Sequence, residues 1–103
     1  MLKNQLTKQL GWLIISSRGG KTRAKILKTV RATPQNANQI ATQLNIDYKT
    51  IRHHLTVLQK NKLITPIGDG AYSTAYTLSE PMEENYCLLE ELTSKTLQQK
   101  PLN

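Results

Sequence analysis

The sequence predicts a mainly helical protein with one small β-hairpin. Over most of the chain, apolar residues recur every three or four positions, which is the period of an amphipathic helix. Between residues 63 and 78 the period falls to two, and a Gly-Asp-Gly turn interrupts the alternation, which indicates two short strands. A length of 103 residues fits one domain. Within it we distinguish an N-terminal helix (1–17), a central domain (18–79) and a C-terminal helix (80–103).

The first two helices are separated by a break that contains paired glycines. Leucines at every fourth position predict a short amphipathic helix over residues 2–15, which is interrupted or ends near Gly11. Residues 16–20 predict the break, because adjacent glycines favour turns over helix interiors. A second helix is expected over about residues 22–31, and Pro34 prevents its continuation.

The next two helices are joined by a three-residue turn, residues 45–47. The first of them begins with a capping box, in which the side chains of Asn36 and Gln39 each accept a hydrogen bond from the other's backbone N–H. In the turn, Asn45 tolerates a left-handed backbone and Asp47 can cap the helix that follows. That helix is expected over about residues 48–61.

The hairpin and a last helix complete the chain. Strands are expected over residues 63–67 and 71–78, on either side of the Gly-Asp-Gly turn. Pro66 places the first strand at the edge of the sheet, because proline has no backbone N–H to donate. Pro81 precedes a helix that is expected over about residues 82–98.

The charge is distributed unevenly along the chain. Residues 1–62 carry twelve Lys and Arg against one acid, whereas residues 63–103 carry two Lys against six acids. This asymmetry indicates that the first two-thirds of the chain face a polyanion. The alternative is a solvated basic surface without a partner. Nucleic acid is the partner class that the charge favours.

The order of the elements is typical of a winged helix-turn-helix protein, in which two helices and a turn precede a hairpin. At 100° per residue, helix 48–61 turns Lys49, Arg52 and His53 away from its apolar face. His54, at the edge of that face, is expected to be a packed structural histidine. Side chains on the exposed face can bind base edges or phosphates. The candidate DNA-binding residues are Tyr48, Lys49, Thr50, Arg52, His53 and Thr56 in this helix, and Arg18, Lys21, Arg23 and Lys28 before it.

Residues 18–78 resemble the archaeal ArsR-like winged helix-turn-helix regulators. The segments that carry the resemblance are Asn-Ala-Asn-Gln-Ile-Ala (36–41), Asp-Tyr-Lys-Thr-Ile-Arg-His-His-Leu (47–55) and Tyr-Thr-Leu (76–78). The resemblance implies the winged fold, binding to double-stranded DNA, and a homodimer. This chain lacks the paired cysteines of metal-sensing relatives, and its Gly-Asp-Gly turn has no Lys or Arg for a phosphate contact.

No enzyme activity, metal or cofactor is expected, and no small-molecule effector is inferred. The adjacent His53 and His54 point about 100° apart on a helix and cannot chelate one metal ion. The single cysteine, Cys87, cannot form an internal disulfide and is expected to be a buried apolar residue. No apolar run approaches the ~20 residues that span a bilayer, so a cytoplasmic location is expected.

Two other functions remain open. One is a protein-interaction scaffold within a larger complex, because winged helices also serve such roles without DNA. The other is an RNA-binding module. RNA readers usually expose aromatic side chains for base stacking, and the basic region offers only Trp12 and Tyr48.

Both terminal helices carry more apolar residues than one small core is expected to cover. We therefore expect a two-fold homodimer with both terminal helices at its interface. The apolar residues concerned are Leu2, Leu6, Leu10, Trp12 and Ile14 near the N-terminus and Met82, Tyr86, Leu89 and Leu92 near the C-terminus.

Overall fold

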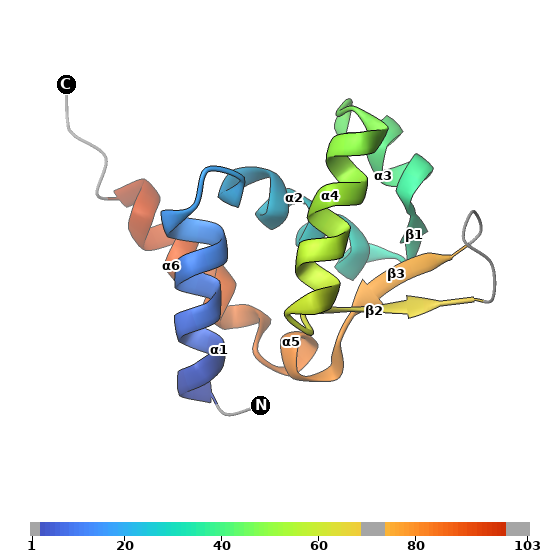
Figure 1. The fold of residues 1–103 in the computed structure, drawn as a ribbon. Helices are drawn as coiled ribbons and strands as arrows, with labels where there is room; N and C mark the ends of the chain where they lie inside the picture. Colours follow the sequence, from blue (N-terminus) through green and yellow to red (C-terminus); the bar gives the residue numbers. More distant parts are fainter. Residues whose placement is uncertain (1–2, 69–73, 99–103) are drawn as a thin grey trace, which may run out of the picture.

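The computed structural model describes residues 3–68 and 74–98, which form a group of helices with a small antiparallel sheet at one side (Figure 1). This confirms the mainly helical fold class. The elements are α1 (Lys3–Leu10), a π-helical segment η1 (Gly11–Ser16), α2 (Gly20–Ala32), β1 (Gln35–Asn36), α3 (Ala37–Leu44), α4 (Tyr48–Lys60), β2 (Ile64–Ile67), β3 (Ala75–Leu78), α5 (Glu80–Glu84) and α6 (Tyr86–Gln98).

The sheet has the strand order β1-β3-β2, and both pairs are antiparallel. β2 is therefore an edge strand, as Pro66 predicted. The strand β1 was not predicted, because two residues are too few to show an alternating pattern. In the hairpin, Ile64 lies opposite Leu78 and Ile67 lies opposite Ala75. The predicted strand residues 71–73, and most of the predicted turn, lie outside the described residues.

The helix signals around α3 and α4 are confirmed in detail. Asn36 and Gln39 form the capping box, and both of its hydrogen bonds measure 2.8 Å. Asn45 has a left-handed backbone with φ 55°, which lets the chain turn between the two helices. Asp47 Oδ2 then accepts from the backbone N–H of Thr50 at 3.1 Å and caps α4.

Most apolar residues of the terminal helices belong to the core of this chain, which corrects the prediction that they exceed one core for all the described ones except Trp12, while Leu2 lies outside the described residues. Leu6, Leu10 and Ile14 are buried at the N-terminal end, and Met82 and Leu89 are buried at the C-terminal end. All of them join one hydrophobic cluster with α2, α3 and α4. A sequence stripe cannot reveal this, because it does not show how much apolar surface the other elements leave uncovered.

One predicted helix boundary is confirmed and one was wrong. The α-helix α1 ends at Leu10 and the π-helical segment η1 begins at Gly11, which confirms the interruption near Gly11. Gly20 does not belong to the break, since it is the first residue of α2. A Cβ at Gly20 would lie 1.7 Å from the carbonyl oxygen of Ile14, so η1 and α2 meet at this glycine.

The predicted last helix is divided in two at Asn85. Its side-chain Nδ2 and its backbone N–H both donate to the carbonyl oxygen of Pro81, at 2.9 and 3.1 Å, and these bonds close α5. α6 then begins at Tyr86. No helix of the described residues is long and apolar enough to cross a membrane.

Candidate nucleic-acid interface

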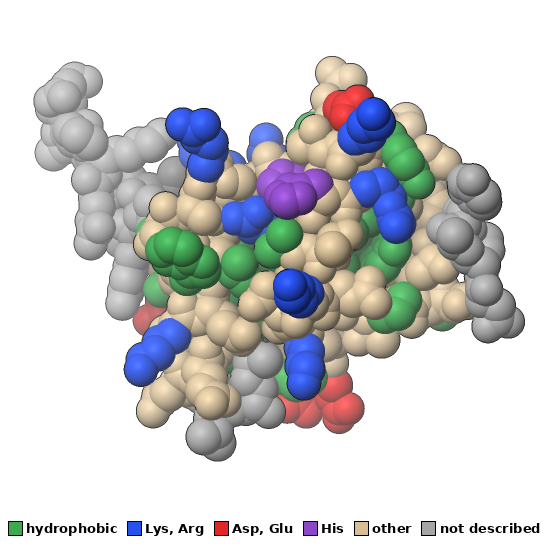
Figure 2. Space-filling view, viewed as in Figure 1, with side chains coloured by type: hydrophobic (Ala, Val, Ile, Leu, Met, Phe, Trp, Pro, Cys, Tyr) green, Lys and Arg blue, Asp and Glu red, His purple; other side chains and the backbone are tan. Residues whose placement is uncertain are grey.

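The exposed side of α4 is polar and basic. Lys49, His53 and Thr56 are exposed and lie at a spacing of four and three residues, which places them on one face of the helix. Tyr48 and Thr50 are exposed in the first turn. In Figure 2, Lys and Arg side chains surround a histidine on the side of the molecule that α4 presents. Five of the six α4 residues predicted to bind DNA are therefore accessible to a ligand.

Arg52, the sixth, is half-buried and directed toward the sheet. Its Nη1 donates to the hydroxyl oxygen of Tyr76 on β3 at 3.1 Å. This bond orients the guanidinium and joins α4 to the hairpin. Since a guanidinium carries five N–H donors, Arg52 keeps others to offer to a ligand.

The loop before α2 lies against α4. A Cβ at Gly19 would lie 2.6 Å from His54 Cε1, so only a residue without a side chain fits there. Arg18 precedes this glycine and is exposed. Lys21, in the first turn of α2, is also exposed, and both line a cavity of about 400 Å³ with Ile15 of η1. Arg18 is therefore next to the glycine that contacts α4, whereas Lys21 shares its cavity with Lys25 of α2 and Thr93 of α6.

Arg23 corrects the sequence analysis, which counted it among the DNA-binding residues. Its side chain is 6% exposed and enters the interior. Nε donates to the carbonyl oxygen of Leu13 at 2.9 Å, Nη1 lies 3.1 Å from His54 Nδ1, and Nη2 donates to Ser17 Oγ. The helix period contained the signal, because Arg23 precedes the buried Ile26 by three residues.

His54 is packed, as predicted, and is 7% exposed. Its Nδ1 faces a guanidinium that can only donate, so Nδ1 is the acceptor and Nε2 carries the proton. Burial, then Arg23, then His53 hold the pKa of His54 below its usual value. Burial also lowers the pKa of Arg23.

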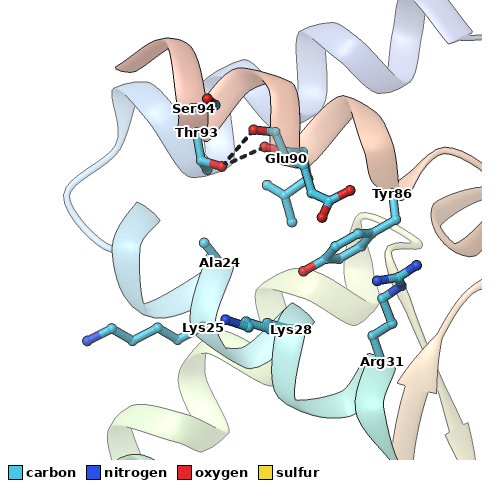
Figure 3. Close-up of a pocket in the computed structure, with 9 residues that line it drawn as sticks. Ala24, Lys25, Lys28, Arg31, Tyr86, Glu90, Thr93 and Ser94 are labelled. Atoms are coloured by element: carbon cyan, nitrogen blue, oxygen red, sulfur yellow. Dashed lines mark hydrogen bonds between the residues drawn. The ribbon is translucent and has the colours of Figure 1, made fainter. Parts of the chain in front are cut away.

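Lys28 lies apart from the α4 surface. It lines a cavity of about 540 Å³ between α2 and α6, together with Lys25, Arg31 and Tyr86 (Figure 3). The Arg31 guanidinium carbon lies 4.2 Å from the ring centre of Tyr86, and Nε lies 3.6 Å from Glu83 Oε1. Lys28 is exposed on the side of α2 that faces α6, and its predicted phosphate contact stays a prediction.

Cys87 is exposed, which corrects the expectation that it is buried. Within residues 3–68 and 74–98, no group of three His, Cys, Asp or Glu side chains is placed to hold a metal ion.

The central segment matches a known family of regulators. Residues 20–65 match the family described as bacterial regulatory protein, arsR family. Within this match, α3, the turn at Asn45 and α4 form a helix-turn-helix. The match spans α2, α3 and α4 and ends in β2, so it includes the capping box, the Asn45 turn and the exposed face of α4. No curated protein sequence matches the chain.

Solved structures support the same fold. The transcriptional regulator HlyU from Vibrio vulnificus CMCP6 is 20% identical, with a TM-score of 0.64, over 87% of this chain and 91% of that one. ZitR from Lactococcus lactis is 21% identical, with a TM-score of 0.58, over 96% and 82%. The homodimeric winged helix-turn-helix DNA-binding domain Mb0332 from Mycobacterium bovis, a possible ArsR-family regulator, is 13% identical, with a TM-score of 0.65, over 100% and 94%. The winged helix-turn-helix fold is confirmed, and the archaeal origin stays a prediction.

Proposed function

We propose that this protein is a cytoplasmic transcription regulator that binds double-stranded DNA sequence-specifically as a homodimer. The observation that carries the proposal is the exposed polar face of α4 in an ArsR-type helix-turn-helix. In this motif the second helix enters the major groove with its N-terminal residues toward the bases. That end of α4 carries Lys49 and His53 and is capped by Asp47.

The roles of the side chains follow from where they lie. Lys49, His53 and Thr56 face outward and bind base edges or phosphates in the groove. Arg52 contributes through the donors that its bond to Tyr76 leaves available. The residues that bind the DNA backbone are Tyr48, Thr50, Arg18 and Lys21.

Two features support a homodimer. The related domain Mb0332 is described as homodimeric. In this chain, Trp12 is 68% exposed and Ile15 is 38% exposed, both on η1. Exposed large apolar side chains of this kind mark contact surfaces. We assign this face of η1, rather than the buried stripes of α1 and α6, to contact with a second copy.

The experiment is a duplex-binding titration of the full-length protein, with an operator obtained by selection from random duplexes and a scrambled control. Lys49→Ala and Arg52→Ala are each expected to lower operator affinity by about 1–3 kcal/mol, with a smaller loss on scrambled duplex. Lys28→Ala is the matched control, because it also removes one exposed positive charge from a helix but lies in the α2–α6 cavity. Its effect should be small on both duplexes.

Three results would count against the proposal. Equal losses on operator and scrambled duplex would mean that Lys49 and Arg52 bind only the backbone. A loss for Lys28→Ala as large as that for Lys49→Ala would place the interface elsewhere. Absence of duplex binding at low salt would favour the interaction scaffold, because a basic DNA-binding surface gives affinity that rises as salt falls.

A further inference from the structure

We propose that Arg23 is a positioning residue for α4, and that its hydrogen bond to a neutral His54 keeps α4 in the arrangement that binds DNA. The inference rests on the proposed function and goes beyond it, because neither residue touches DNA. It makes DNA binding sensitive to protonation at a site in the protein interior.

The geometry places one side chain at the junction of three segments. From α2, Arg23 reaches the carbonyl oxygen of Leu13 in η1, the hydroxyl of Ser17 in the following loop, and Nδ1 of His54 in α4. Gly19 closes the junction from the loop side, since any Cβ there would collide with the His54 ring. η1 and its loop, α2 and α4 are therefore held to one another through the same guanidinium.

The charges at this junction are unbalanced. The three acceptors of Arg23 are a carbonyl, a hydroxyl and an imidazole, and all three are neutral. Among the residues that the structure describes, no carboxylate is paired with Arg23. The groups that face His54 are Arg23 from α2 and His53 from α4, with ring centres of the two histidines 5.5 Å apart. From η1 and its loop, only Leu13, Ser17 and Gly19 take part, and none of these is charged.

Protonation of His54 would remove the bond and add a repulsion. Nδ1 would become a donor and could no longer accept from Arg23. Two cations about 3.1 Å apart would then share a buried site without an anion. Because the folded-state pKa of His54 is lowered, the pair persists above that value and is lost as the pH falls through it. Loss of the bond between Arg23 and His54 would displace the α4 backbone at His54. This residue is adjacent to His53, which lies on the DNA-binding face.

Two histidines lie next to each other in α4 and have to be separated experimentally. His53 is exposed on the α4 surface, whereas His54 is buried. The chain has two histidines. His53→Gln therefore leaves His54 as the one histidine in the chain.

The test compares full-length His53→Gln with the double variant His53→Gln, His54→Gln. In the single variant, the His54 ring is titrated by NMR. Over the same pH range, the affinity of this variant for a short DNA duplex of random sequence is measured. Below the NMR midpoint, the affinity for the duplex is expected to fall by up to tenfold for each unit by which the pH is lowered. The reason is that the one proton taken up by His54 has to be released for binding. The double variant should lose this dependence, because the glutamine oxygen accepts from Arg23 at every pH. Circular dichroism confirms that each sample is folded.

A third variant covers the case in which the double variant fails to fold. In His53→Gln, Arg23→Met, the positive neighbour is gone, so the NMR midpoint of His54 should move up, while burial still holds it below its usual value. An unchanged midpoint would overturn the pairing. Loss of affinity in the folded double variant with the same pH slope would overturn the positioning role. Duplex binding absent from every variant at every pH would instead count against the proposed function, while the NMR midpoints would still decide the pairing.

Discussion

Gly20→Ala tests the close approach between η1 and the start of α2. A Cβ at this position would lie 1.7 Å from the carbonyl oxygen of Ile14, whereas real Cβ contacts essentially never fall below 3.0 Å. The first turn of α2 or the end of η1 would therefore have to move by more than an ångström. Ile14 and the neighbouring Leu13 are both buried, so the movement disturbs packed side chains.

The expected magnitude follows from two opposing terms. Overpacking a well-packed interior typically costs about 1–3 kcal/mol, and a backbone obstacle belongs at the upper end of that range. Replacing glycine by alanine in a helix returns up to about 1 kcal/mol. The free energy of unfolding should thus fall by about 2 kcal/mol, which in a domain of this size lowers Tm by about 8 °C. Gly11→Ala is the matched control, since a Cβ there has no atom within 4 Å.

The assay is urea denaturation followed by circular dichroism, at one protein concentration because self-association would make stability concentration-dependent. Gly11→Ala should be at least as stable as the parent protein, by up to about 1 kcal/mol. The two alanine variants should then differ by about 2–3 kcal/mol. If Gly20→Ala matches or exceeds the stability of Gly11→Ala, the contact between η1 and α2 is wrong.

Two further predictions concern assembly and alkaline stability. Trp12→Ser should weaken self-association at least about tenfold in sedimentation at tens of micromolar, because exposed tryptophans often dominate interfaces. The control Ile67→Ala changes a residue that is also exposed but lies on β2, and it should not weaken self-association. A parent protein that sediments as a monomer would contradict the dimer. Burial raises the pKa of Tyr86, so its contribution to stability is present below about pH 10 and is lost as the pH rises through the raised value. Urea denaturation of Tyr86→Phe should show a weaker loss of stability above pH 10 than the parent protein, and equal losses would exclude Tyr86 as the cause.

The features that the sequence predicted correctly are those that depend on near neighbours. The capping box joins Asn36 to a residue three positions away, Asp47 caps α4 across the same distance, and Asn45 needs only its own tolerance of a left-handed backbone. Pro66 marks an edge strand through its missing donor. The packed state of His54 follows from its place beside the apolar face of one helix.

The features that sequence reasoning missed depend on residues far apart in the chain. Arg23 is indistinguishable from Arg18 by composition, yet its partners lie 10 and 31 positions away, in η1 and α4. Arg52 is oriented by Tyr76, 24 positions further on. Lys28 lines the cavity between α2 and α6, and the sequence alone does not show that α6 packs beside α2.

The sequence by itself determined the caps of α3 and α4, the turn between them and the polar face of α4, because backbone hydrogen bonding and helix period act within a few residues. The tertiary structure decided which basic residues face outward and which are buried, and it placed both terminal helices in one core. The physical reason is desolvation: whether a charged or apolar side chain leaves water depends on the surfaces that pack against it, and distant segments supply those surfaces.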